Sequence, residues 1–565
     1  MRLLAALTAF VPPALALPSP AQASGVIDNV NGIALDADGR LVRFGAMTID
    51  DEGRVENLLP GRYQEPARPK KLKKGESWAK GPDFKLDAGG RTLIPGLIDS
   101  HGHVMRLGLA QITLDLSGTR SLADAQSKIR DYVAANPGRK WIIGTGWDQE
   151  RWGLTRFPTA ADLDAAASEV PVWLVSADGH TGWANSLAMK AAGITAATKA
   201  PPGGRVDLAG GKPSGLFVDR AMDLVQRIVP PPAPKDRDIA LEKTQQMLLA
   251  NGVTSVADMG TTLEDWQAFR RSADRGALRV RIIAYADGID DMVLIAGPEP
   301  TPWLYDDHLR LGGVNLLLDG GLGTRGAWLK ADYADAPGQH GLSLIPSTQL
   351  RNVMSRAAMD NFQIAVDANG DAANSEMLDA ITELSETYKG DRRWRIEQAA
   401  IVSPGDLPRF AQNDIIASMQ PPAWSSAWRM ATARLGEARL KGAYAWKSML
   451  DNRVPLALGS DVPGESANPF VGMAMVMSRE TAQGESAGGG TPEQRMSFEA
   501  ALDGYSRRGA MAGFAEKRFG SLIPGQRADF LLIDRDISAA QPADIRAAQV
   551  LETWIGGKRV YMKGR

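Results

Sequence analysis

The chain has 565 residues, 44% of them hydrophobic and 23% charged, with a formal net charge of −2. These values are typical of a globular protein, and the length predicts either several domains or one large barrel with additions. The near-neutral charge provides no electrostatic footprint for nucleic acid or an anionic membrane surface, and the absence of cysteine excludes disulfides, thiolate metal ligands and a cysteine nucleophile.

The first 23 residues have the pattern of a secretory signal peptide. Arg2 supplies the positive charge, residues 3–17 form the apolar segment, and Ala21-Gln22-Ala23 matches an A-x-A cleavage site. Four prolines between positions 12 and 20 argue against a spanning helix, and the apolar run is too short for one. The sequence therefore predicts a periplasmic or secreted protein that begins at Ser24 and has no membrane partner.

Both ends of the remaining chain carry short strand-like runs between turns. Residues 32–35 precede the turn signal Asp36-Ala37-Asp38-Gly39, and residues 41–49 run into a second turn. Near the C-terminus, strand-like runs recur at 529–533, 550–555 and 558–561. We expect residues 24–92 and 508–565 to pair as a small β-sandwich domain.

The centre of the chain alternates strand-like and helix-like stretches. The strand-like runs number eight and lie at residues 93–104, 253–257, 278–284, 313–319, 362–367, 394–397, 415–419 and 454–461. This alternation predicts a parallel sheet, and eight strands favour an α/β fold with a closed (β/α)8 TIM barrel over residues 93–507. Residues 107–220 are too long for a simple connection after strand one, so we predict an insertion that caps the barrel mouth.

The first of these strands ends in a His-x-His pair. Residues two apart on a strand point to the same side, so His101 and His103 direct their imidazoles at one point. Imidazole is a preferred ligand of zinc and related metals. Sites in such barrels lie at the C-terminal strand ends, where Asp367 ends strand five and Asp461 ends strand eight. These four residues are the predicted ligands of one divalent metal, with zinc preferred, although oxygen ligands also admit harder metals.

The same residues suggest a hydrolytic chemistry. A bound divalent metal lowers the pKa of a water molecule to about 7 and polarises a carbonyl group. A neighbouring carboxylate then carries the proton to a leaving nitrogen, and Asp461 and Asp367 are the candidate catalytic residues. The candidate substrate-binding residues are His180, Gln398, Arg325 for a carboxylate and Trp424 for an apolar group.

Several stretches resemble the amidohydrolase superfamily. They are residues 93–104 with the His-x-His pair, Gly459-Ser460-Asp461, and the closing stretch 520–529. Residues 146–153, 178–185, 319–323 and 418–421 are similar to the branch that contains N-substituted formamide deformylase. The resemblance covers nearly all of the chain after residue 23. It implies a hydrolase of carbon–nitrogen bonds other than peptide bonds, acting on a small amide or formamide-like substrate.

The chain departs from this family at metal-ligand positions. Two-metal members carry a bridging lysine on strand four and a histidine at the end of strands five and six, and the resemblance places these at Asn315, Asp367 and Gln398. A further histidine is expected just after the Gln-Pro of strand seven, where this chain has Ala423 followed by Trp424. The binuclear site is therefore not carried over, and a single metal is expected.

Three functions remain open from the sequence. The first is the metal-dependent amidohydrolase, which the residues favour. The second is a metal-free lyase, isomerase or hydrolase that uses the same His/Asp cluster for acid–base chemistry, and the third is a non-catalytic periplasmic ligand-binding protein. The sequence leaves open the substrate, the metal and whether the chain forms a homo-oligomer.

Overall fold

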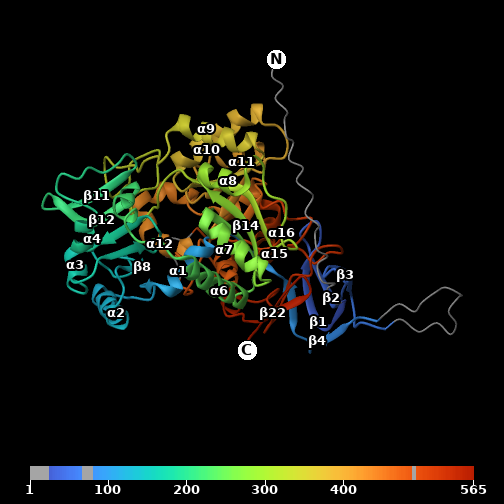
Figure 1. Cartoon of the computed structure of the whole chain (residues 1–565). Coiled ribbons are helices and arrows are strands. Elements are labelled where there is room, and N and C mark those ends of the chain that lie inside the picture. Colours follow the sequence, from blue (N-terminus) through green and yellow to red (C-terminus); the bar gives the residue numbers. More distant parts are fainter. Residues whose placement is uncertain (1–23, 66–80, 486–490, 565) are drawn as a thin grey trace, which may run out of the picture.

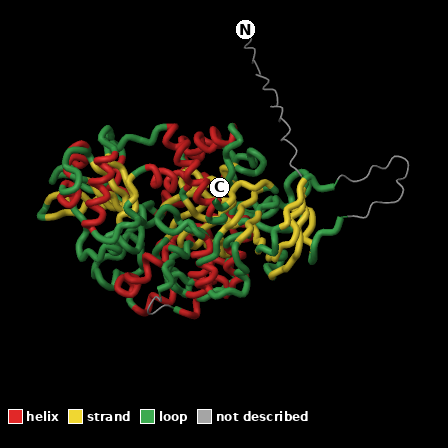
Figure 2. The backbone as a smooth tube through the Cα atoms, turned by 90° about the horizontal axis from the view of Figure 1, so that it is seen from below, coloured by secondary structure: helices red, strands yellow, loops and turns green. Residues whose placement is uncertain are grey.

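The computed structural model describes residues 24–65, 81–485 and 491–564. Within them the strands form three sheets, with an eight-stranded barrel flanked by a sheet from both chain ends and by a six-stranded sheet (Figure 1). Figure 2 shows the same three groups of strands from below, with helices around the central group. The predicted signal peptide, residues 1–23, lies outside the described residues. No described helix combines the length and apolarity needed to cross a membrane.

The central sheet confirms the predicted (β/α)8 barrel. Its strands are β6 (Leu97–Gly102), β13 (Val253–Thr261), β14 (Arg281–Asp287), β15 (Leu309–Leu317), β16 (Gln363–Ala368), β17 (Arg395–Gln398), β18 (Ile416–Met419) and β19 (Leu456–Leu458). Each pairs in parallel with the next. The ring closes where the backbone N–H groups of Ser460 and Asp461 donate to the carbonyl oxygen of His101, at 3.2 and 2.8 Å.

Helices follow most of the barrel strands and cover their outer faces. They include α6 (Pro234–Ala250), α7 (Leu263–Asp274), α8 (Gly288–Ala296), α9 (Ser347–Met359), α10 (Asp371–Thr387), α11 (Leu407–Gln412), α12 (Ala423–Leu435), α13 (Trp446–Asp451), α14 (Pro469–Ser478), α15 (Phe498–Gly504) and α16 (Arg507–Ala512). Every residue of β16 is buried, as expected of a parallel strand covered on both faces. The apolar centre of β16, residues 364–366, is the part of this burial that the sequence itself shows.

The two chain ends share one sheet. Its strands are β1 (Gly25–Leu35), β2 (Leu41–Ile49), β3 (Val55–Leu59), β4 (Phe84–Asp87), β5 (Thr92–Pro95), β20 (Phe530–Ile533), β21 (Val550–Ile555) and β22 (Lys558–Met562). The antiparallel pairing of β5 with β20 joins the N-terminal to the C-terminal strands, so the region predicted as a small sandwich is one continuous sheet. Leu531 and Ile533 pack into the barrel core, whereas Phe530 and Leu532 join a separate cluster on the other face.

The predicted opening strand is divided between two sheets. The run 93–104 was expected to be one barrel strand, but β5 belongs to the end sheet and only β6 to the barrel. The junction is Gly96, whose N–H donates to the carbonyl oxygen of Asp529 at 2.9 Å. A Cβ atom at Gly96 would lie 2.5 Å from Oγ1 of Thr254, so only glycine allows this close passage. The chain therefore leaves the end sheet three residues later than predicted.

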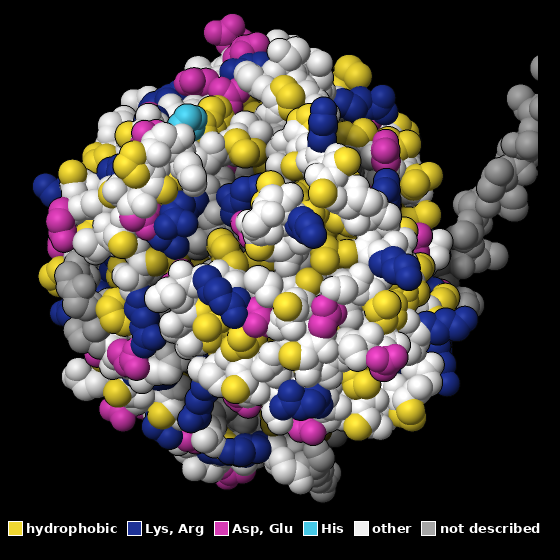
Figure 3. Space-filling model, turned by 90° about the vertical axis from the view of Figure 1, so that its left-hand side faces the viewer, with side chains coloured by type: hydrophobic (Ala, Val, Ile, Leu, Met, Phe, Trp, Pro, Cys, Tyr) yellow, Lys and Arg dark blue, Asp and Glu magenta, His cyan; other side chains and the backbone are white. Residues whose placement is uncertain are grey.

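The third sheet lies between β6 and β13 along the chain. It contains β7 (Leu114–Asp115), β8 (Ile142–Trp147), β9 (Val172–Ser176), β10 (Thr181–Ala184), β11 (Gly204–Ala209) and β12 (Lys212–Asp219), with helices α1 (Val104–Ile112), α2 (Leu122–Ala135), α3 (Ala160–Asp164), α4 (Ser186–Ala191) and α5 (Asp223–Gln226) alongside. Trp147, Trp152 and Trp183 form its core, with ring centroids 5.8–6.4 Å apart. Figure 3 faces this side of the molecule, where acidic and basic side chains are interspersed.

A buried ion pair joins the barrel to the end sheet. Nε and Nη2 of Arg281, at the start of β14, donate to the two carboxylate oxygens of Asp529 at 2.7 and 2.9 Å. Nη1 of Arg281 also donates to the backbone carbonyls of Asp306 and Asp307, and Asp529 accepts from the N–H of Gly556. Arg281 is fully buried and Asp529 is 4% exposed, so this pair exists almost without water.

We expect His308, near this pair, to make stability depend on pH. Burial, together with the nearby Arg281 guanidinium, lowers the pKa of His308 to about 4. Between about pH 6.5 and pH 4 the unfolded chain therefore binds a proton that the folded chain does not. The free energy of unfolding thus decreases as the pH is lowered through this range, by at most about 3 kcal/mol. Urea unfolding at pH 7 and pH 4.5 should show a smaller fall for His308→Gln than for the parent.

The exposed His340 provides the control for this experiment. His340→Gln removes a histidine whose side chain is 56% exposed and should follow the parent at both pH values. An equal pH dependence in His308→Gln and the parent would show that His308 does not contribute.

Candidate metal centre

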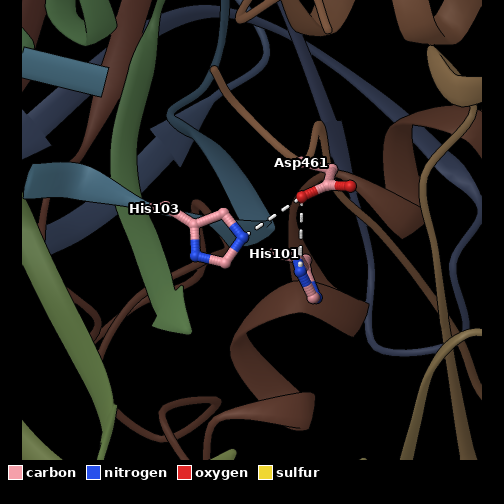
Figure 4. Close-up of side chains that lie close together, drawn as sticks. All are labelled: His101, His103 and Asp461. Atoms are coloured by element: carbon pink, nitrogen blue, oxygen red, sulfur yellow. Dashed lines mark ion pairs between the residues drawn. The ribbon is translucent and has the colours of Figure 1, made fainter. Parts of the chain in front are cut away.

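Two imidazoles and a carboxylate converge at the C-terminal end of the barrel. His101 lies in β6, His103 follows it directly, and Asp461 follows β19. Oδ1 of Asp461 lies 3.2 Å from Nε2 of His103 and 3.6 Å from Nε2 of His101 (Figure 4). Among the described residues, these three form a group whose ligand atoms all lie within 4.8 Å of one another. The structure thus brings together residues that are 360 positions apart.

The second ring nitrogen of each histidine is already engaged. Nδ1 of His103 lies 2.7 Å from the carbonyl oxygen of Met259, which can only accept, so this nitrogen carries the proton. Nδ1 of His101 lies 2.9 Å from Oε2 of Glu397. In the neutral rings both Nε2 atoms then present lone pairs towards Asp461, the arrangement in which histidines bind metals.

The ligand spacing fits a single divalent ion. Tetrahedral zinc with bonds of 2.0–2.1 Å holds its ligand atoms about 3.3 Å apart. The separations of 3.2 and 3.6 Å from Asp461 to the two histidines agree with that spacing. Two imidazoles and one carboxylate leave the fourth position for water or substrate, which is the composition of a catalytic rather than a structural site.

The seam between β19 and β6 fixes the position of Asp461. Asp461 has a left-handed backbone with φ of +63°, which aspartate tolerates better than most residues. The buried Asp99 accepts from the N–H groups of Ser460, at 2.9 Å, and His101, at 3.2 Å, and from the hydroxyl of Ser460. This carboxylate therefore holds the strand that carries the imidazoles against the turn that carries Asp461.

Glu397 is a buried partner of His101 to which the sequence analysis gave no role. Burial alone would raise its pKa, but the Arg395 guanidinium and His101 together hold the pKa below its usual value. Nε of Arg395 donates to Oε1 of Glu397 at 2.6 Å, and Nη2 donates to Ser100 and Ser418. The signal in the sequence is an Arg and a Glu two apart on one buried strand, which places both on the same face.

Asp367 lies beside the three-residue group rather than within it. Its Oδ1 is 3.7 Å from Nε2 of His101, and its Oδ2 accepts from the amide of Asn315 at 2.7 Å. Burial raises the pKa of Asp367 to about 6. Gln398 donates to Oδ2 of Asp461 at 2.9 Å. Asn315 and Gln398 stand where the resemblance to the amidohydrolase superfamily implies metal ligands, and both are amides that hydrogen-bond to carboxylates.

The charges of the cluster favour a bound cation. Burial would lower the pKa of His101, but the surrounding carboxylates of Asp367, Glu397 and Asp461 raise it to about 9. Burial would also raise the pKa of Asp461, but the two imidazoles and Gln398 hold it well below its usual range. The His103 imidazole behaves differently, because burial and the nearby Arg106 lower its pKa.

His180 reaches the site from the insertion. Its Nδ1 lies 2.9 Å from Oδ1 of Asp219, and the ring faces a hollow of about 130 Å³ that Asp461 and Gln398 also line. A Cβ atom at Gly321 would lie 3.2 Å from Cδ2 of His180, so the glycine leaves space for the ring. Asp178 and Glu465 line the same hollow and were not among the predicted site residues. No local motif in the sequence marks Asp219 as the partner of His180.

The structure places the other two predicted substrate contacts away from this hollow. Nε and Nη2 of Arg325 donate to the carboxylate of Asp335 at 3.2 and 3.0 Å, so the guanidinium is engaged. Trp424 is 5% exposed and packs against Tyr444 and under the Arg479 guanidinium, 4.3 Å from the ring centroid. Neither residue lines the hollow, although their neighbours Thr324 and Ala423 do.

Comparison with known proteins gives matches over most of the chain. The profile described as "Amidohydrolase family" matches residues 86–561. Protein LONG AFTER FAR-RED 3 of Arabidopsis thaliana is 34% identical over 496 residues, covering 85% of this chain and 84% of that protein. N-substituted formamide deformylase of Arthrobacter pascens is 26% identical over 509 residues, covering 86% and 91%.

A solved structure shows the same fold. An uncharacterized metal-dependent hydrolase from Pyrococcus horikoshii OT3 superimposes with a TM-score of 0.73 and is 23% identical. The match covers 92% of this chain and 99% of that one. The barrel, the end sheet and the insertion are therefore parts of one known architecture.

Proposed function

The chain belongs to the amidohydrolase family, and from this premise we propose that it is a metal-dependent hydrolase that cleaves a small amide or formamide-like C–N bond. The observation that carries the proposal is the convergence of Nε2 of His101 and His103 on Oδ1 of Asp461, with both Nδ1 atoms engaged elsewhere. The 26% identity with N-substituted formamide deformylase supports the choice of bond.

His101, His103 and Asp461 would hold the metal. A divalent ion held there supplies a water of lowered pKa and polarises the substrate carbonyl. Asp461 accepts the proton of the attacking water and delivers it to the leaving nitrogen, which converts a poor leaving group into an amine. Gln398 keeps the carboxylate of Asp461 in place through its hydrogen bond to Oδ2.

His180 is positioned to bind the substrate carbonyl. Burial would lower its pKa, but Asp219 and Asp178 raise it to about 9, so the ring is protonated at neutral pH. With Nδ1 held by Asp219, the other nitrogen is free to donate into the hollow beside Asp461. A cationic donor there stabilises the negative charge that develops on the carbonyl oxygen.

Metal removal tests this proposal. We expect elemental analysis of the purified full chain to find one divalent metal per chain. A chelator should abolish hydrolysis of N-substituted formamides and simple amides, and added zinc or another divalent ion should restore it, because the metal supplies the activated water.

Two results would contradict the proposal. Hydrolysis that persists at full rate in the metal-depleted chain would favour acid–base chemistry by the His/Asp cluster alone. A chain that takes up no divalent metal from a supplied excess would exclude the proposed centre.

A further inference from the structure

A second, larger cavity lies between the barrel and the insertion. Its volume is about 910 Å³, within the range of about 300–1,000 Å³ usual for small-molecule sites. The walls come from α1, the insertion sheet and the segment 219–237. The cavity shares Ser176, Ala177 and His180 with the small hollow at Asp461. The two spaces therefore lie next to each other at these three residues.

Most of the larger cavity's wall is apolar. Half-buried apolar side chains from α1 and the insertion sheet line it, namely Leu109, Ile112, Trp141, Ile143 and Val175. Leu317, at the C-terminal end of β15, also lines it and is 41% exposed. Leaving this surface in water is unfavourable by roughly 25 cal/mol for each Å², so an apolar ligand that covers it gains affinity.

Arg106 provides a cation at the edge of this wall. It lies on α1 three residues after His103, it is exposed, and it lines the cavity. A Cβ atom at Gly179 would lie 2.6 Å from its Nη2, so the absence of a side chain there makes room for the guanidinium. Within the described ranges Arg106 makes no hydrogen bond and no ion pair, whereas Arg237 in the same wall pairs with Asp265.

No carboxylate of the wall pairs with Arg106, although the buried carboxylates of Asp258 and Asp287, outside the wall, interact with it electrostatically. Asp219 pairs with His180, Asp265 pairs with Arg237, and Asp236 accepts from the N–H of Ala233 at the start of α6. Asp223 is the remaining carboxylate of the wall, which also contains the cations Arg139, Lys140 and Arg220. The cavity thus combines an apolar wall with an excess of positive charge.

We propose that this cavity binds an amphipathic carboxylate, with its apolar body against the apolar side chains that include Leu317 and its carboxylate on the Arg106 guanidinium. Arginine recognises a carboxylate through two parallel N–H···O bonds. The inference deepens the proposed function and rests on it for one point, the identity of the ligand as a substrate. The substrate would then be an amide that also carries the carboxylate and the apolar body, and its C–N bond would reach His180 and Asp461. Binding itself does not depend on hydrolysis.

Direct binding measurements test the inference. Decanoate, decyltrimethylammonium and decanol would be titrated into the full chain in the presence of a chelator. The chelator removes any bound metal, so that binding of decanoate to a metal ion cannot contribute to the signal. Calorimetry and the fluorescence of Trp141 and Trp173, both in the wall, provide the readouts. We expect saturable binding of one decanoate per chain, about 10-fold tighter than either other probe and weaker with butanoate.

Variants of the wall sharpen the test. Arg106→Gln should weaken decanoate binding by about 10-fold and leave decanol binding unchanged. Leu317→Asn should reduce the advantage of decanoate over butanoate. The matched control is Arg130→Gln on α2, because Arg130 is also exposed but does not line the cavity. Far-UV circular dichroism would show that each variant is folded.

Three outcomes would overturn the inference: no saturable binding of decanoate, equal binding of decanoate and decyltrimethylammonium, or unchanged decanoate binding by Arg106→Gln. Decanoate binding by a chain that hydrolyses no amide would support the cavity and contradict the proposed hydrolase. Amide hydrolysis by a chain that binds no decanoate would support the proposed hydrolase and contradict the proposed carboxylate site in the cavity.

Discussion

Asp461→Asn is expected to lower kcat for amide hydrolysis by about 10³-fold or more. The amide cannot accept the proton of the attacking water, and a positioned general base alone contributes about 10²–10⁴-fold. An amide is also a weaker metal ligand than a carboxylate, because it carries no charge. The substitution keeps the size of the side chain, and asparagine tolerates the left-handed backbone at this position. The fold should stay intact, but the free energy of unfolding should fall, because the ionised Asp461 carboxylate is stabilised by the two imidazoles and Gln398 in the folded chain.

Asp414→Asn is the matched control for this variant. Asp414 is exposed and also has a left-handed backbone, with φ of +51°. Both variants and the parent would be compared by kcat, by metal content and by urea unfolding. Turnover by Asp461→Asn within about 10-fold of the parent, with the metal still bound, would remove Asp461 from the proton-transfer role.

Asp461→Asn does not by itself distinguish a metal-dependent from a metal-free reaction. In both cases the carboxylate faces the imidazoles of His101 and His103, so its loss disrupts either mechanism. Chelation separates the two, because only the metal-dependent reaction loses its activated water when the metal is removed. Nδ1 of His103 donates to a backbone carbonyl, so the neutral ring presents a lone pair at Nε2. This arrangement favours the metal-dependent mechanism.

The barrel could be predicted because its strands are buried on both faces. β13 and β16 are buried along nearly their whole length, without the alternation of a strand that has one face in water, as expected of strands in a parallel barrel. The division of the run 93–104 could not be predicted from the residues. Leu93 and Leu97 are equally apolar and equally buried, and nothing local indicates that they lie in different sheets. That division depends on contacts of Gly96 with Thr254 and Asp529, far along the chain.

The candidate site shows the same limit. His101, His103 and Asp461 stand at strand ends, so the fold alone predicts that they meet. The pairing of Glu397 with His101 depends on how the strands are staggered around the ring, which the sequence does not specify. The direction of Arg325 depends on its loop, where a positive φ of 58° turns the chain and the side chain pairs with Asp335. The contact of Arg325 with a substrate carboxylate stays a prediction from residue type.

Arg281→Met is expected to lower the free energy of unfolding by about 3–5 kcal/mol, because it leaves the carboxylate of Asp529 buried without a counter-charge. Urea unfolding would measure the loss. Arg279→Met is the matched control two residues away, because Arg279 pairs with Glu242 at the surface and such pairs contribute about 0–1 kcal/mol.

The double variant Arg281→Met/Asp529→Leu separates the ion pair from packing. Replacing both partners of a buried pair by apolar residues removes the isolated charge, so part of the lost stability should return, although the hydrogen bonds to Asp306, Asp307 and Gly556 stay lost. The backbone carbonyl of Asp529 still accepts from Gly96 in this variant, so the junction between the end sheet and β6 is kept. If Arg281→Met is as stable as Arg279→Met, or the double variant is no more stable than Arg281→Met, then the pair does not hold the two sheets together. Recovery in the double variant would show that the penalty comes from the isolated charge.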